Sequence, residues 1–179
     1  MLLQNEKLLI RNLKITDSHL LVKWLSNPVV LQYYEGRDNP HDLDKVMEHY
    51  YHRSDERVTP CIIEYDGVEI GYIQFYPITE RERNEYGYTD QMEIIFGTDQ
   101  FIGEADYWNK GVGKLLVHSI VDFLITKKSA NRVVMDPQVW NERAVTCYER
   151  CGFKKVKFLE KHELHEGVMQ DCWLVEYTK

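Results

Sequence analysis

Several features that mark membrane, secreted or metal-binding proteins are missing from this sequence. No run of about 20 apolar residues occurs, so we expect no transmembrane helix. Residues 1–7 do not form a signal-peptide pattern. The four cysteines show neither metal-ligand nor disulfide spacing, and His162 and His165 lie outside a His-Glu-x-x-His zinc frame. We therefore expect a cytoplasmic protein with free thiols and no metal.

Basic residues are also in deficit, since 22 Lys and Arg face 29 Asp and Glu, for a net charge of −7. This deficit argues against nucleic acid and anionic membranes as partners, and it permits a cationic partner. Repeats, linkers and low-complexity segments are absent. With 179 residues, 44% of them hydrophobic, the chain is long enough for a substantial core. We expect one domain over residues 1–179.

The hydrophobic periodicity changes several times and predicts both strands and helices. Asp66-Gly67 predicts a two-residue hairpin turn, and the polar residues 79–90 predict a loop or hairpin tip. Residues 29–38 predict a loop with exposed tyrosine rings, and residues 161–167 a charged connection. The expected strands are 8–13, 58–65, 69–76, 91–98, 131–135, 153–160 and 168–177, and the expected helices are 17–26, 42–52, 111–128 and 141–151.

These elements predict an α/β fold with a mixed (α+β) sheet, in the order β-α-α-β-β-β-α-β-α-β-β. The long helix from about Gly111 to Lys128 separates two strands, which predicts a parallel pair with a right-handed crossover. One strand of this splayed pair ends at Asp99 and the other at Asp136. Because open α/β sheets bind ligands at the carboxyl ends of parallel strands, both carboxylates are site candidates.

The run from Asp99 to Lys114 links a strand to the long helix and contains Gly111-x-Gly113. Unpaired N–H groups at a helix start attract phosphate, and glycine lets a ligand approach the backbone. A phosphate-bearing donor beside the Asp99 carboxylate suggests group transfer. The alternative is an ordinary tight turn, with Lys110 and Lys114 as solvated charges.

Two longer patterns carry a resemblance to the GCN5-related N-acetyltransferase superfamily. Its acyl-CoA loop, Gln/Arg-x-x-Gly-x-Gly/Ala, corresponds to residues 108–113, with Trp108 in place of Gln or Arg. Its second pattern, Asn-x-x-Ala-x-x-x-Tyr-x-x-x-Gly-Phe, corresponds to residues 141–153. Within the superfamily, residues 24–25, 33–38, 99–103, 107–108, 135–137 and 162–167 resemble the aminoglycoside 6′-N-acetyltransferases. They resemble especially the acetyltransferase half of the form fused to a phosphotransferase, and we expect no kinase domain here.

The resemblance implies acetyl transfer from acetyl-CoA to the 6′-amine of an aminoglycoside, which would give antibiotic resistance. The pyrophosphate would lie against the first N–H groups of the long helix. The pantetheine arm would bind the splayed strands through main-chain hydrogen bonds. The cofactor-binding residues implied in this way are Phe101, Ile102, Trp108, Asn109, Lys110, Gly111, Val112, Gly113, Lys114, Asn141 and Tyr148.

Asp99 and Tyr148 are the candidate catalytic residues. Asp99 would bind the amine and accept its proton, although an ordinary Asp pKa of about 3.9 suits an amine anchor better than a base at neutral pH. Tyr148 would protonate the departing CoA thiolate, since thiol and tyrosine pKa values of about 8.5 and 10 allow that transfer. A core tyrosine is the alternative for Tyr148, and helix capping is expected of Asn141 in either case.

A polycationic drug needs dispersed carboxylates and flat aromatic surface. For most of the candidate carboxylates, the alternative interpretation is an ordinary solvated charge on the surface. For Trp24, the alternative is a residue of the hydrophobic core. The acidic composition fits a polyamine or peptide N-terminus equally well, and a non-catalytic acyl-CoA-binding regulator is a third reading. The candidate substrate-binding residues are Trp24, Tyr34, Glu56, Asp99, Asp136 and Glu163.

Overall fold

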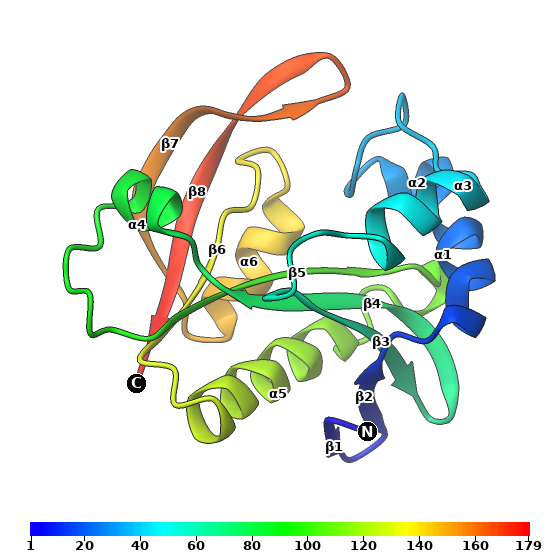
Figure 1. Cartoon of the computed structure of the whole chain (residues 1–179), viewed down its shortest axis with the longest axis horizontal. Helices are drawn as coiled ribbons and strands as arrows, with labels where there is room; N and C mark the ends of the chain where they lie inside the picture. Colours follow the sequence, from blue (N-terminus) through cyan, green and yellow to red (C-terminus); the bar gives the residue numbers. More distant parts are fainter. The chain divides into compact units, whose positions relative to one another are not determined.

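Strands and helices alternate along the chain in the computed structural model, which describes all 179 residues (Figure 1). The strands are β1 Leu3–Asn5, β2 Leu8–Asn12, β3 Thr59–Tyr65, β4 Val68–Pro77, β5 Ile95–Ile102, β6 Arg132–Met135, β7 Lys154–His165 and β8 Val168–Thr178. The α-helices are α1 Ser18–Leu25, α2 Pro28–Leu31, α3 Leu43–Val46, α4 Glu80–Tyr86, α5 Val112–Lys127 and α6 Glu142–Arg150. Short helices of other types are η1 Ile15–Asp17, η2 Met47–Tyr51 and η3 Ala105–Tyr107.

The strands are hydrogen-bonded in the order β1-β2-β3-β4-β5-β6-β8-β7. β5 and β6 run parallel, with Gly97 opposite Val134, whereas β6 and β8 run antiparallel. The predicted mixed sheet with a parallel pair is confirmed, and so is the crossover through the long helix between its two members.

The chain forms two compact units, which we describe separately. Unit 1 holds residues 1–74, 100–112 and 165–167, and unit 2 holds residues 75–99, 113–164 and 168–179.

In unit 1 the first three α-helices pack around a shared apolar cluster (Figure 1). Leu21, Trp24 and Leu25 lie on one face of α1 and are at most 1% exposed. Asn27 then stops the chain from continuing α1, because its side chain accepts a hydrogen bond from the Val29 N–H and caps α2. Pro28 occupies the first position of α2, where its missing N–H costs nothing.

In unit 2 the apolar residues of β5, β6, β7 and β8 share one cluster that includes Ile95, Val134, Leu159 and Leu174. Gly152 follows α6 with φ +94°, the left-handed conformation that ends a helix, as predicted. Figure 1 shows α4 beside the β7–β8 hairpin, and the Lys157 Nζ donates to the Glu85 carbonyl between them.

Several predictions about the elements are wrong or incomplete. Residues 79–90 contain helix α4 rather than only a loop, because Thr79 and Glu82 form a reciprocal capping box. β5 continues through Asp99 to Ile102, β7 continues through the expected connection to His165, and β1 was missed. The expected helix 42–52 is α3 followed by the π-helix η2.

Gly71 on β4 has no room for a side chain, and this generates a stability prediction. A Cβ at this position would lie 2.3 Å from the Phe101 carbonyl oxygen and 2.9 Å from the Ile102 Cα. Because both are backbone atoms of the paired strand, they cannot rotate away. We expect Gly71→Ala to lower the free energy of unfolding by about 2 kcal/mol, measured by urea denaturation.

Gly113→Ala is the matched control, because its added Cβ would meet nothing closer than the Cys147 Sγ at 3.8 Å. We expect this variant to be unchanged or stabilised by up to about 1 kcal/mol, since alanine favours a helix. Equal stability of the two variants would contradict the steric argument.

Candidate active site

Two predicted carboxylates lie just beyond the paired segment of the parallel strands β5 and β6 in unit 2. Asp99 follows Gly97 by two residues, and Asp136 follows Val134 by two residues, where Gly97 and Val134 are the last paired residues of the two strands. Both aspartates are partly exposed. The prediction that they lie at one level of the sheet rests on this register.

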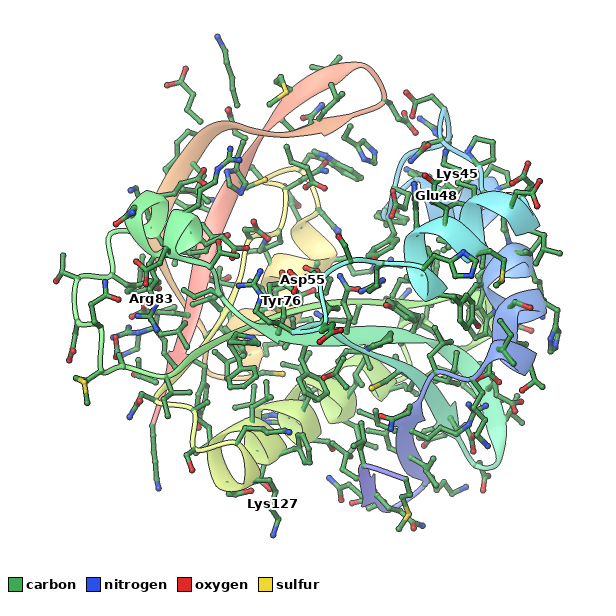
Figure 2. The ribbon with its side chains drawn as sticks, in the orientation of Figure 1. Lys45, Glu48, Asp55, Tyr76, Arg83 and Lys127 are labelled. Atoms are coloured by element: carbon green, nitrogen blue, oxygen red, sulfur yellow. The ribbon has the colours of Figure 1, made fainter.

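Tyr76, which the sequence did not single out, lies with both aspartates. Its side chain projects from the C-terminal part of β4 (Figure 2). Burial raises the pKa of the Tyr76 hydroxyl, and the negative charges of Asp99 and Asp136 raise it further. Gly97 makes room for the ring, because a Cβ there would lie 2.6 Å from the Tyr76 Cε2. Gly97 therefore has a steric role in the site.

Asp136 accepts two hydrogen bonds from separate elements. The Tyr86 hydroxyl of α4 donates to its Oδ2 at 3.0 Å, and the Nε2 of His162 on β7 lies 2.8 Å from the same oxygen. The other ring nitrogen of His162, Nδ1, lies 2.9 Å from the Glu85 Oε1. The bond to Asp136 raises the pKa of His162 despite its partial burial. From the sequence, His162 was examined only for a zinc frame, which it does not fit, and this network was not predicted.

Glu163 lies next to the same network on β7. Its Oε2 accepts a hydrogen bond of 2.9 Å from the buried amide of Gln138. Burial raises the pKa of the Cys172 thiol, and the charges of Glu163 and Asp136 raise it further, which places both carboxylates near that thiol. Two predicted substrate residues, Asp136 and Glu163, therefore lie near the same thiol.

Helix α6 carries the two predicted residues of the second family pattern. Asn141 accepts a hydrogen bond from the Ala144 N–H at 3.3 Å, which confirms its capping role. Tyr148 is half-buried, with its ring centre 6.1 Å from that of Phe153. It is therefore not a fully buried core tyrosine.

The predicted acyl-CoA loop has a backbone suited to phosphate. Asn109 and Gly111 have φ values of +58° and +81°, and helix α5 begins directly after them at Val112. Nothing lies within 4 Å of the position where a Gly111 Cβ would stand. A left-handed turn at the N-terminus of a 16-residue helix leaves unpaired N–H groups facing an approachable surface. These residues fit a pyrophosphate group.

The neighbouring predicted cofactor residues have structural partners in unit 1. The Trp108 indole N–H donates to the Ile102 carbonyl at 2.8 Å, which fixes the loop against the end of β5. The Phe101 ring is buried, so any contact of this residue with a ligand falls to its backbone. Lys110 and Lys114 are exposed, as their solvated alternative requires.

The aromatic substrate candidates cluster around Phe101. Its ring centre lies 4.6 Å from Tyr34 and 6.0 Å from Trp24. Trp24 is 1% exposed and donates to the Glu104 Oε1 at 2.8 Å, which favours its core role. Gly103 admits the Trp24 ring, since a Cβ there would meet it at 2.2 Å.

Tyr34 and Glu56 are the remaining substrate candidates of unit 1. Tyr34 is half-buried rather than exposed as the loop prediction implied. Its loop is held by Glu166 at the β7–β8 turn, which accepts hydrogen bonds from the Arg37 side chain at 2.6 and 2.7 Å and from the Arg37 N–H at 3.0 Å. Glu56 is exposed between η2 and β3.

The comparisons with known proteins identify the class of this chain. The family model of the acetyltransferase (GNAT) domain matches residues 14–161. The chain therefore belongs to the GNAT family, and it is an acetyltransferase that uses acetyl-CoA. No helix of the structure is both long and apolar enough to span a membrane.

Within that family, the chain is similar to aminoglycoside acetyltransferases. Aminoglycoside N(6′)-acetyltransferase type 1 of Klebsiella pneumoniae is 28% identical over 153 residues, covering 84% of this chain and 76% of the relative. The structure of AAC(6′)-Ib with coenzyme A has a TM-score of 0.76 at 25% identity and covers 96% of this chain and 95% of that chain. The spermidine N-acetyltransferase of Vibrio cholerae, solved with CoA and spermine, has a TM-score of 0.77 at 20% identity, with 97% and 96% covered, and shows the fold alone.

The placement of Tyr76 beside two carboxylates predicts a loss of activity in Tyr76→Phe. Removing a hydroxyl next to charged acceptors costs roughly 1.4 kcal/mol, which is about tenfold in kcat/KM for the amine. The ring and its fit over Gly97 are kept, so we expect stability to be retained and the KM for acetyl-CoA to stay within about twofold.

Tyr65→Phe serves as the control, because Tyr65 makes a ring contact with Tyr107 that phenylalanine preserves. Steady-state kinetics of both variants measure the effect. Equal kcat/KM values for the two would exclude a role for the Tyr76 hydroxyl.

Proposed function

We propose that this protein acetylates the 6′-amino group of aminoglycosides with acetyl-CoA, and that residues 1–179 act as one acetyltransferase domain. The observation that carries the proposal is the pair of aspartates around Tyr76, each two residues beyond the last paired residue of the β5–β6 pair. Two nearby carboxylates suit a ligand with several ammonium groups. The similarity to aminoglycoside acetyltransferases supports the same substrate class.

For acetyl-CoA, we propose binding by the loop and first turn of α5. The left-handed turn at Asn109 and Gly111 supports this assignment, because it precedes a helix N-terminus. Lys110 and Lys114 would add positive charge near the pyrophosphate. The full set proposed for the cofactor is Phe101, Ile102, Trp108, Asn109, Lys110, Gly111, Val112, Gly113, Lys114, Asn141 and Tyr148.

For the chemistry, we propose that Asp99 acts on the substrate amine and that Tyr148 acts on the departing CoA thiolate. Asp99 binds the substrate ammonium and accepts its proton directly or through water, and the neutral amine then attacks the thioester carbonyl. The tetrahedral intermediate collapses with loss of the CoA thiolate, and the former amine nitrogen loses its second proton to water to give the neutral amide. Tyr148 donates its proton to that thiolate, and its partial exposure on α6 is compatible with this role.

For the drug, we propose that Asp136 and Glu163 bind further ammonium groups. Tyr34 supplies aromatic surface, and Trp24 acts mainly by supporting the ring cluster below it. Glu56 adds an exposed carboxylate. The proposed substrate residues are thus those named from the sequence: Trp24, Tyr34, Glu56, Asp99, Asp136 and Glu163.

A polyamine is the second candidate substrate, since spermidine also carries several ammonium groups. The structural likeness to a spermidine acetyltransferase keeps this candidate open at the level of the fold. A peptide N-terminus is a third amine substrate. A non-catalytic acyl-CoA-binding regulator is the alternative from another class, and it predicts CoA binding without turnover.

Release of free thiol from acetyl-CoA distinguishes these functions. We expect turnover with kanamycin and tobramycin that exceeds turnover with spermidine or short peptides, because several carboxylates can engage the drug at once. Reactions without amine and without protein are the controls. Absence of turnover with every aminoglycoside would refute the proposed substrate, and turnover with spermidine alone would replace it.

Asp99→Asn tests the role of the first carboxylate. The amide keeps the shape of the side chain but loses the charge that binds the ammonium group and accepts its proton. We expect kcat/KM for kanamycin to fall by at least about tenfold, or roughly 1.4 kcal/mol of barrier.

Asp122→Asn is the matched control, since Asp122 is exposed on α5. We expect this variant to keep the activity of the unmodified protein. Unchanged turnover and unchanged amine affinity in Asp99→Asn would remove Asp99 from both the catalytic and the binding role.

A further inference from the structure

His162 is clamped between two carboxylates in unit 2. Its Nε2 lies 2.8 Å from the Asp136 Oδ2 and its Nδ1 lies 2.9 Å from the Glu85 Oε1, while its side chain is 15% exposed. A neutral imidazole has one N–H donor, whereas an imidazolium has two. Two carboxylates at hydrogen-bond distance from both nitrogens therefore match the imidazolium form.

The charged surroundings of His162 are mainly acidic. Helix α4 contributes Glu85 and the Tyr86 hydroxyl, the segment after β6 contributes Asp136, and β7 itself contributes the adjacent Glu163. Lys157 is the one cation bound nearby, on the Glu85 main-chain carbonyl. Asp171 and the Cys172 thiol of β8 also lie near these acids. The hydrogen bond to Asp136, together with the charges of Asp136 and Glu85, raises the pKa of His162.

The two hydrogen bonds that orient Asp136 reach only one of its two carboxylate oxygens. Both the Tyr86 hydroxyl and the His162 Nε2 contact the same oxygen, Oδ2. The Asp136 side chain is 34% exposed, and its Oδ1 contacts neither Tyr86 nor His162, so we take Oδ1 as the oxygen that a ligand from solvent would bind. An ammonium group that binds Oδ1 therefore shares one carboxylate with the imidazolium.

We propose that His162 is a specificity-determining residue of the Asp136 subsite, an internal imidazolium that offsets the carboxylate until an ammonium group of the substrate binds and the His162 proton is released to solvent. The inference rests on the proposed function in one respect, that Asp136 binds an ammonium group of the substrate. His162 positions Asp136 and contributes its charge, and it does not touch the reacting atoms.

The sign of the pH dependence follows from the repulsion between two cations. Binding of the ammonium group is weaker while His162 is protonated and stronger once it is neutral. The affinity for a cationic ligand therefore rises as the pH increases through the pKa of His162, and it falls again only where the ligand amines lose their own protons. By linkage, ligand binding lowers the pKa of His162 by the same coupling.

NMR titration of the His162 ring Cε1–H measures this coupling directly. In the free protein we expect a pKa above the ordinary value of about 6.5. Saturation with kanamycin should lower it by at least about 0.5 unit, a coupling of about threefold in affinity. His118, an exposed histidine on α5, is the internal control and should shift by less than about 0.1 unit.

Variants at position 162 test whether the charge of His162 weakens ligand binding. The measurement is the affinity for kanamycin by calorimetry, without acetyl-CoA, at pH 6 and pH 8.5. His162→Gln, which has no titratable charge, should bind about threefold more tightly than the unmodified protein at pH 6 and equally at pH 8.5. His162→Lys keeps a cation at both pH values. This variant should therefore lack the increase in kanamycin affinity that the unmodified protein shows between pH 6 and pH 8.5. His118→Gln should match the unmodified protein.

The outcomes separate this inference from the proposed function. A His162→Gln variant that is weaker by the same factor at both pH values would show a purely structural role and overturn the inference. If kanamycin is acetylated but does not move the His162 pKa, the inference fails while the proposed function stands. If spermidine moves the pKa and kanamycin is not acetylated, the inference holds and the substrate proposal fails. No shift with either ligand overturns the inference.

Discussion

The candidate site depends on one constraint, the parallel pairing of β5 with β6. Because Gly97 lies opposite Val134, the two strands deliver Asp99 and Asp136 at equal distances beyond the last paired residues. Gly97 also lacks the side chain that would exclude the Tyr76 ring, so the last paired residue of β5 makes room for the third member of the group. A slip of either strand by one residue would turn its own carboxylate to the opposite face and separate the two aspartates, since side chains alternate along a strand.

Features governed by neighbouring residues could be predicted from the sequence. The Asn141 cap and the left-handed Gly152 follow from local hydrogen bonding and backbone sterics, and both are confirmed. The parallel pair was also predictable, because a strand, a long helix and a second strand allow few arrangements. The same logic gave Asp99 and Asp136 as a pair before their register was known.

Features governed by distant residues could not be predicted in the same way. Asp99 resembles the end of a strand in sequence, yet β5 continues to Ile102 because the chain stays hydrogen-bonded to β4, as the Gly103 N–H to Ile70 carbonyl bond shows. The strand over 153–160 was predicted, but its continuation to His165 was not, because residues 161–165 are mostly polar and charged. Helix α4 was a different kind of error, since its capping box from Thr79 to Glu82 is a local signal that was overlooked.

The network around Asp136 follows from those missed elements and shows how an acidic site can keep its carboxylates ordered without a ligand. Helix α4 brings Glu85 and Tyr86, and the extension of β7 brings His162, so neither partner could be named while both segments were treated as loops. Carboxylates that lie close together repel one another and resist ionisation unless donors are present. Tyr86 and His162 supply donors to one oxygen of Asp136, which orients a carboxylate whose side chain is 34% exposed. A fixed cation at this position would compete with every cationic substrate, whereas a histidine can lose its charge near neutral pH.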